Sequence, residues 1–239
     1  MTDNQLINLN QSYLKDQIIT YLGNKRKLLS HINLAIEEIK LNLNKNYINS
    51  FDGFSGSGVV SRLLKLHSNK LIVNDLEYYC YVINKCYLSN LDATQINEIK
   101  DKIDYLNSER KNYNKKGFIE KLYCSENDDN IQVGERLFFT NENGKIIDYL
   151  RSLIKDDDYY SLSSLLYKVS VNNNTSGVFK GFYKDTETNK GQFGGNAKNA
   201  LKRITKTIEL SYPIFFKNQC QTIVKQKDTN ILVKDIENE

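Results

Sequence analysis

A glycine-rich stretch and an acidic residue stand at a spacing that could bind a nucleoside-type cofactor. Residues 51–58 are Phe-Asp-Gly-Phe-Ser-Gly-Ser-Gly, and they follow a short stretch typical of a strand. Glycine lets the backbone turn tightly and approach a ligand, because no Cβ stands in the way. Asp75 ends a second apolar stretch nineteen residues after Gly56, where an acid can bind ribose hydroxyls. A structural corner at the glycines and a helix cap at Asp75 are the alternatives, and the two features together favour the cofactor.

The apolar residues around these two features are spaced as in an α/β fold. The predicted elements are a helix over 28–39, a strand at 47–52, the glycine turn, a helix at 59–66, a strand at 70–75 and a helix at 78–88. Strand, glycine turn, helix, strand and helix form the beginning of a doubly wound α/β domain. In such domains ligands bind at the carboxyl ends of the strands, where both features lie.

The pattern changes after about residue 92, where no further strand follows at the usual spacing. Polar residues 1–17 are expected to be a loose lead-in, and residues 107–132 and 172–199 are expected to be loops. Further helices are predicted at 96–106, 137–139, 146–153, 160–171 and 201–208, and a last strand is predicted at 221–225. The middle of the chain is therefore expected to be mainly helical.

The composition excludes several classes of protein and of site. Of the 239 residues, 40% are hydrophobic and 26% are charged, as in an ordinary globular protein. No apolar run approaches the ~18 residues of a membrane span, and no signal peptide is evident at the start. The four cysteines form no Cys-x-x-Cys pair, which predicts a reduced, cytoplasmic protein. Two histidines are too few for a Cys/His zinc site or a Ser-His-Asp relay, so no metal is expected.

Positive charge is concentrated in one segment of the chain. Residues 177–206 contain seven Lys or Arg and two acids, a local charge of +5, whereas the whole chain carries +4. The remaining residues therefore sum to about −1. Such an uneven distribution is expected where a protein contacts a polyanion. The alternative is a solvated, lysine-rich loop.

Three motifs in the first third of the chain resemble a known family. They are Tyr-Leu-Gly-Asn-Lys-Arg-Lys-Leu-Leu at 21–29, the glycine-rich stretch at 51–58 and Val-Asn-Asp-Leu-Glu at 73–77. Together they resemble the amino-terminal half of N6-adenine DNA methyltransferases of the Dam-like group, which use S-adenosylmethionine (SAM). Residues 172–183 and 194–204 look like target-recognition segments of this family, and the resemblance covers roughly residues 18–235. It implies a partial Rossmann-like methyltransferase sheet with an inserted, mainly helical recognition domain.

The resemblance implies roles for the residues that would surround the methionine part of SAM. Tyr21 and Lys25 match positions that contact the cofactor, with the lysine near its carboxylate. Phe54, Gly56 and Gly58 match the loop beneath the methionine part. From its local sequence alone, Lys25 could equally belong to a surface turn that opens a helix.

A second set of matching residues would contact the nucleoside part of SAM. Asp75 matches the acid that binds the ribose. Asp228 and Thr229, just past the last predicted strand, match less closely the pair that contacts the adenine.

One departure from the family determines what the chain can do alone. The family's catalytic tetrad, Asp-Pro-Pro-Tyr, is absent, because the chain contains a single proline, Pro213. The expected fold also stops after three strands, which leaves the first strand as an unpaired edge prone to aggregation. The simplest interpretation is a split enzyme, in which a partner supplies the tetrad and completes the sheet. A fragment of a longer, single-chain enzyme is the alternative.

These inferences combine into an expected organisation and function. Residues 1–92 and 213–239 are assigned to the SAM-binding domain, and residues 93–212 to recognition of double-stranded DNA. Lys180, Lys184 and Lys198 are candidates for phosphate contacts, and Asn199 and Arg203 for contacts to base edges or for plain helix-surface roles. The resemblance implies methyl transfer to adenine N6 after base flipping. A regulatory relic that binds nucleic acid without SAM and an enzyme acting on RNA are the rival interpretations.

Overall fold

The chain divides into two compact units in a computed structural model that describes residues 10–20, 23–177, 180–195 and 198–236. One unit comprises Met1–Asn97 and Pro213–Glu239, and the other comprises Glu98–Tyr212. The boundary at residue 97 falls inside a helix, α6, which spans Ala93–Glu109.

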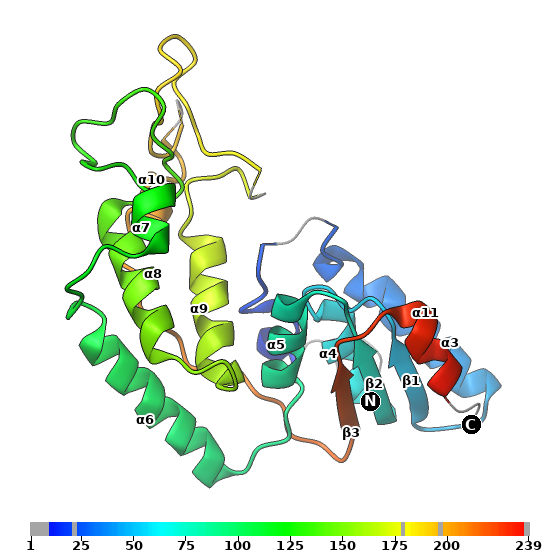
Figure 1. Cartoon of the computed structure of the whole chain (residues 1–239). Helices are drawn as coiled ribbons and strands as arrows, with labels where there is room; N and C mark the ends of the chain where they lie inside the picture. Colours follow the sequence, from blue (N-terminus) through cyan, green and yellow to red (C-terminus); the bar gives the residue numbers. More distant parts are fainter. Residues whose placement is uncertain (1–9, 21–22, 178–179, 196–197, 237–239) are drawn as a thin grey trace. The chain divides into compact units, whose positions relative to one another are not determined.

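The first unit is built on a parallel sheet of three strands (Figure 1). The strands β1 (Ile48–Asp52), β2 (Ser68–Asn74) and β3 (Gln221–Lys225) lie in the order β1-β2-β3, with both pairs parallel. Among the described residues no strand pairs with the outer edge of β1. The helical elements of this unit are α2 (Gln11–Lys15), η1 (Arg26–Leu28), α3 (Leu29–Asn42), α4 (Val59–His67), α5 (Tyr78–Tyr87), α11 (Thr229–Leu232) and η2 (Val233–Asp235).

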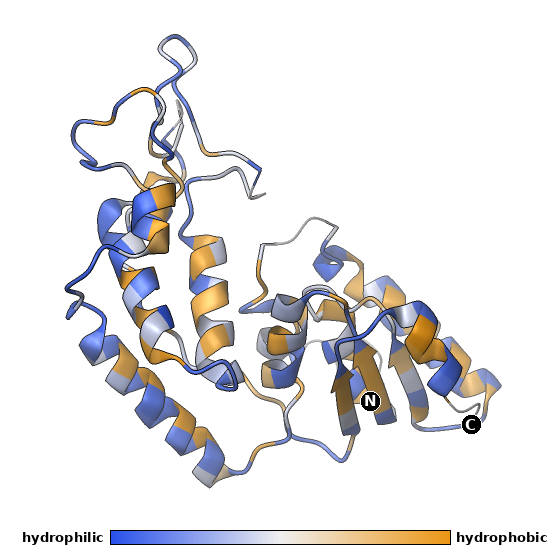
Figure 2. Ribbon diagram, in the orientation of Figure 1, coloured by the Kyte–Doolittle hydropathy of each residue, from blue (hydrophilic) through white to orange (hydrophobic). Residues whose placement is uncertain are grey.

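The core of this unit forms where apolar faces of the helices meet the sheet. Leu71 and Val73 of the central strand are fully buried, together with Leu63 on α4. A strand between two parallel neighbours buries both faces, which is why β2 is apolar through its centre (Figure 2). The sequence-based prediction of strand, glycine turn, helix, strand and helix is confirmed here.

The expected loose lead-in is wrong for the described part of residues 1–17. Residues 11–15 form α2, and Tyr13 and Leu14 are buried in the core. Arg62 on α4 fixes this segment, because its Nη1 donates to the Tyr13 carbonyl at 2.7 Å. Two apolar residues in a polar stretch are a weak local signal, and the segment is ordered by this distant contact.

The second unit is mainly helical. Its helices after α6 are α7 (Phe118–Tyr123), α8 (Asn141–Leu153), α9 (Tyr159–Val171) and α10 (Leu201–Ile204). Thr140 caps α8 by accepting from the Asn143 N–H, and Asp158 caps α9 by accepting from the Ser161 N–H. Apolar and polar residues alternate along α6 and α8 (Figure 2), as expected for helices that bury one face. No helix in the described ranges is both long enough and apolar enough to cross a membrane.

Three local predictions for this unit are wrong. Residues 107–132 include α7 rather than forming only a loop, and residues 137–139 are not helical. The helix expected over 201–208 ends at Ile204. The observed helices α7 and α10 are shorter than two turns, and tertiary contacts decide where such short helices form and end.

Residues 172–199, predicted to be an exposed loop, contain both buried and exposed parts. Asn172, Asn173, Asn174 and Thr175 are all at least 95% buried. Residues 183–192 form a hairpin, in which the Gln192 N–H donates to the Tyr183 carbonyl at 3.0 Å and the Asp185 N–H donates to the Lys190 carbonyl at 2.8 Å.

Candidate functional site

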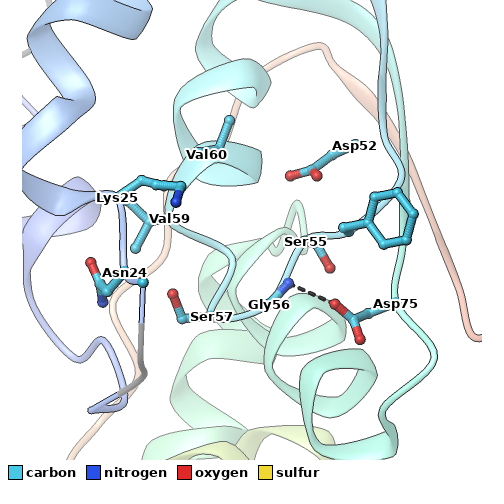
Figure 3. Close-up of a pocket in the computed structure, with 11 residues that line it drawn as sticks. Asn24, Lys25, Asp52, Ser55, Gly56, Ser57, Val59, Val60 and Asp75 are labelled. Atoms are coloured by element: carbon cyan, nitrogen blue, oxygen red, sulfur yellow. Dashed lines mark hydrogen bonds between the residues drawn. The ribbon is translucent and has the colours of Figure 1, made fainter.

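A cavity of about 430 Å³ lies beside the carboxyl ends of β1 and β2 (Figure 3). Its walls come from the segment before α3, the glycine-rich loop, the start of α4 and the end of β2. The lining residues are Gly23, Asn24, Lys25, Asp52, Phe54, Ser55, Gly56, Ser57, Val59, Val60 and Asp75. Lys25, Phe54, Gly56 and Asp75, which the sequence analysis singled out, therefore meet at one site.

The glycine-rich loop needs its glycines for conformation and for space. Gly56 and Gly58 have φ values of +51° and +75°, which side-chain-bearing residues adopt at a cost. A Cβ on Gly58 would lie 2.7 Å from Oδ1 of Asn84, on α5. Gly58 does not line the cavity, but it begins α4 directly after the loop. The corner is thus structurally required, and it also exposes backbone to the cavity.

Asp75 couples the loop to the following helix. Its Oδ2 accepts from the Gly56 N–H at 2.7 Å, and its Oδ1 accepts from the Glu77 N–H at 3.0 Å (Figure 3 shows the first bond). Glu77 is the N-cap position of α5, so Asp75 holds the turn that leads into that helix. The Asp75 carboxylate also takes a hydrogen bond from the Cys80 thiol, and since a carboxylate has about four acceptor positions, capacity remains for a ligand hydroxyl. The arrangement therefore fits a ribose while also serving the turn.

Opposite charges line the same cavity. Asp52, at the end of β1, accepts from the Ser61 hydroxyl at 2.6 Å. Burial raises the pKa of Asp52, and the Ser61 hydrogen bond opposes this shift. Lys25 is exposed on the other lining segment. An anion and a cation on one cavity suit a zwitterion such as the amino-acid part of SAM.

Asp52 is a candidate that the sequence analysis did not select. The sequence contains a signal for it, because Asp52 stands directly before the glycine-rich loop at the end of the first strand, where parallel sheets bind ligands. The buried Asn74 was likewise missed as a functional residue. Its amide Nδ2 donates to the Lys227 carbonyl and to Thr229 Oγ1, at 2.9 and 3.0 Å, and so joins the ends of β2 and β3.

The remaining predicted cofactor residues are Tyr21, Asp228 and Thr229. Tyr21 is outside the described residues. Thr229 donates its hydroxyl to the Gly53 carbonyl at 2.7 Å, and Asp228 caps α11 by accepting from the Asn230 N–H at 2.8 Å. Neither Asp228 nor Thr229 is among the described residues that line the cavity.

The predicted DNA-contact residues fall into two groups in the second unit. Lys180, Lys184, Lys198 and Asn199 are exposed. Arg203 is half-buried, and its guanidinium donates to the backbone carbonyls of residues 171, 173 and 175. A guanidinium held in this way is occupied within the protein, so its placement gives no support to the predicted contact with a base edge.

Several curated proteins are similar to this chain over most of its length. Type II methyltransferase M.NlaIII of Neisseria lactamica is 28% identical over 230 residues, which cover 91% of this chain and 61% of that protein. Type II methyltransferase M.CviAII of Paramecium bursaria Chlorella virus 1 is 30% identical over 78% of this chain and 52% of its own length. Modification methylase LlaI of Lactococcus lactis subsp. lactis is 28% identical over 90% of this chain and 33% of its own length. The chain thus spans about three fifths of the length of these relatives or less.

No solved structure is a significant match to this chain. The family of D12 class N6 adenine-specific DNA methyltransferases, which use SAM as methyl donor, matches residues 21–235. This range includes every described residue that lines the cavity and the whole of the second unit. The chain belongs to the D12 class of N6 adenine-specific DNA methyltransferases.

Proposed function

We propose that this chain is the SAM-binding and DNA-recognition subunit of a split, site-specific N6-adenine DNA methyltransferase, and that a partner chain supplies the catalytic tetrad. The observation that carries this proposal is the cavity at the carboxyl ends of β1 and β2, lined by Lys25, Gly56 and Asp75, in a chain of the D12 class. A fragment of a single-chain enzyme would use the same site in the same way.

The residues of the cavity can be assigned to the parts of SAM. Asp75 would accept from the ribose hydroxyls, Lys25 would bind the carboxylate, and Asp52 would bind the ammonium group. The ring of Phe54, 82% exposed, would cover the methionine part. SAM supplies a methyl group on a sulfonium. Asp228 keeps an exposed carboxylate for the adenine.

The second unit would hold the DNA. Lys180, Lys184 and Lys198 are exposed cations that would contact phosphates, and Asn199 is an exposed amide that would contact a base edge. Because adenine N6 takes part in base pairing, the target base would have to leave the duplex before it is methylated.

The tetrad would have to come from residues other than these 239. A single proline rules out Asp-Pro-Pro-Tyr within them. Among the described residues the outer edge of β1 is unpaired, which supports a partner that pairs there, because unpaired strand edges promote association. The share of the relatives' length that this chain leaves unmatched is compatible with either a partner chain or further sequence on the same polypeptide.

Titration calorimetry with SAM tests the cofactor assignment directly. We expect the chain to bind SAM and its demethylated product, S-adenosylhomocysteine, and not to bind NAD, which has an adenosine but no amino-acid part. A chain that binds duplex DNA but none of these nucleosides would instead be a regulatory nucleic-acid-binding protein, which is the second candidate. Binding to NAD as tight as binding to SAM would remove the roles of Lys25 and Asp52.

A further inference from the structure

Asn174 connects the hairpin of residues 183–192, which carries Lys184 and Lys190 as well as Asp185 and Glu187, to the rest of the second unit. Asn174 is fully buried, and each of its polar groups is bonded. Its backbone N–H donates to the Phe138 carbonyl at 2.7 Å, and its own carbonyl accepts from the Tyr183 N–H at 3.1 Å. The side chain donates to the carbonyls of Leu137 and Gln192, at 2.8 and 3.1 Å, and accepts from the Gly194 N–H at 3.0 Å. Asn174 therefore fixes both ends of the hairpin.

Arg203 holds the backbone on either side of Asn174. Nη1 donates to the carbonyls of Val171 and, at 2.9 Å, of Asn173, and Nη2 donates to the carbonyl of Thr175 at 3.3 Å. The carbonyls of every second residue, 171, 173 and 175, therefore accept from Arg203, while the carbonyl of Asn174 between them accepts from the hairpin. In return, the Asn172 side chain donates to the Arg203 carbonyl at 3.1 Å.

This geometry distinguishes two roles for an arginine in a DNA-binding unit. An arginine that recognises guanine donates two hydrogen bonds to the base edge, so its guanidinium N–H groups must not be occupied within the protein. Arg203 directs its fork of donors at three carbonyls of its own chain. A guanidinium suits this task, since its five donors lie in a rigid plane, whereas a lysine offers a single ammonium.

We propose that Arg203 is a positioning residue for DNA binding: it fixes residues 171–175, and Asn174 in turn fixes the hairpin that presents Lys184 to phosphates. The role in DNA binding rests on the proposed function. The fixing of the hairpin is a property of the free protein and can be measured without DNA.

Hydrogen exchange and salt-dependent DNA binding, both on the full chain, test this role together. Arg203→Met should speed amide exchange in the peptide covering 183–194 tenfold or more and leave exchange in α8 unchanged. On a mixed-sequence duplex, it should also lower the slope of log affinity against log salt by about 0.9, the value expected for loss of the Lys184 contact. Lys202→Met removes the same charge from the exposed neighbouring position, and it should leave exchange unchanged and lower the slope by at most ~0.9.

Arg203→Lys keeps the charge but loses the fork, so exchange of the hairpin should fall between those of the wild type and Arg203→Met. If Arg203→Met also accelerates exchange in α8, Arg203→Lys becomes the deciding variant.

Unchanged hairpin exchange in Arg203→Met would overturn the positioning role, and a slope lowered by one contact would then make Arg203 a direct phosphate ligand. Faster exchange with an unchanged slope would also overturn it, because the hairpin would not serve DNA binding. Failure of the wild type itself to bind the duplex would refute the proposed function instead.

Discussion

Asp75 illustrates how one carboxylate can serve structure and ligand at once. It accepts from the Gly56 and Glu77 N–H groups and also lines the cavity. We expect Asp75→Ala to weaken SAM binding by roughly 1.5–3 kcal/mol, the scale of a lost charge-assisted hydrogen bond. Calorimetry on both proteins measures this change. Glu77→Ala, at an exposed neighbouring position, is the matched control. Equal affinity of Asp75→Ala and wild type would reduce Asp75 to a turn acceptor.

Residue types and spacing predicted Gly56 and Asp75 in the cavity lining, because glycines after a strand and an acid after the next strand are local signals; Lys25 and Phe54 were expected only from the family resemblance. Residue types and spacing did not distinguish an arginine facing solvent from one facing carbonyls. Arg203 and Arg62 have the same charge in the sequence, yet Arg62 is fully buried and Arg203 is half-buried. Burial depends on contacts with residues distant in sequence, and a single sequence does not show these.

At the scale of elements, α4 carries two cations into the core. Arg62 lies 3.8 Å from the centroid of the Tyr87 ring and donates to the Tyr13 and Asp16 carbonyls. Lys65 is also fully buried, and its Nζ donates to the carbonyls of Ser89 and Phe216 at 3.0 and 2.7 Å. Both cations bond to carbonyls of segments distant in the sequence, so α4 holds α2 and the segments around Ser89 and Phe216 in place within the first unit.

The buried ammonium of Lys65 predicts a pH dependence of stability. Burial lowers its pKa from 10.5 to about 8, so between these values the unfolded chain binds the extra proton and stability rises with pH. We expect the free energy of unfolding, measured in urea, to gain about 1 kcal/mol from this group between pH 8 and pH 9. Lys65→Met should lack this gain. Burial raises the pKa of Cys220 to about 11, and Lys65 opposes this shift; the buried thiol lowers stability at higher pH in both proteins. Parallel pH profiles of the two proteins would contradict the assignment.

The exposed lysines of the second unit predict a different dependence, on salt. If Lys180, Lys184 and Lys198 contact phosphates, replacing all three by Gln should flatten the slope of log affinity against log salt by at most about three units. Fluorescence anisotropy on a mixed-sequence duplex measures this slope. Lys100 and Lys102, exposed on α6, provide a control pair for nonspecific loss of charge. A wild-type slope in the triple variant would identify the segment as a solvated loop.

Elements of the first unit were more predictable than those of the second. The strands and helices between residues 47 and 88 have strong apolar periodicity and a glycine turn between them. In the second unit, α7 and α10 are short, and residues 172–175 are buried although their side chains are polar. Runs of asparagine usually indicate loops, so these residues carry no local signal of burial.

At the scale of the whole molecule, the sheet and the proline count lead to the last prediction. The β1 edge is unpaired among the described strands, and the tetrad cannot lie within these residues. Purified alone, the chain should therefore transfer no methyl group from labelled SAM to any adenine-containing duplex, and it should self-associate in sedimentation experiments.

Co-expression with the partner chain should remove both the inactivity and the self-association. The product of a neighbouring reading frame that encodes Asp-Pro-Pro-Tyr should pair with the β1 edge, yield a soluble complex and restore methyl transfer to adenine N6. Replacing the tetrad's aspartate in that product by alanine is the control, since it should keep the complex and abolish transfer. Robust transfer by the purified 239-residue chain would refute a split enzyme. Transfer that requires the tetrad on the same polypeptide would identify these residues as part of a single-chain enzyme.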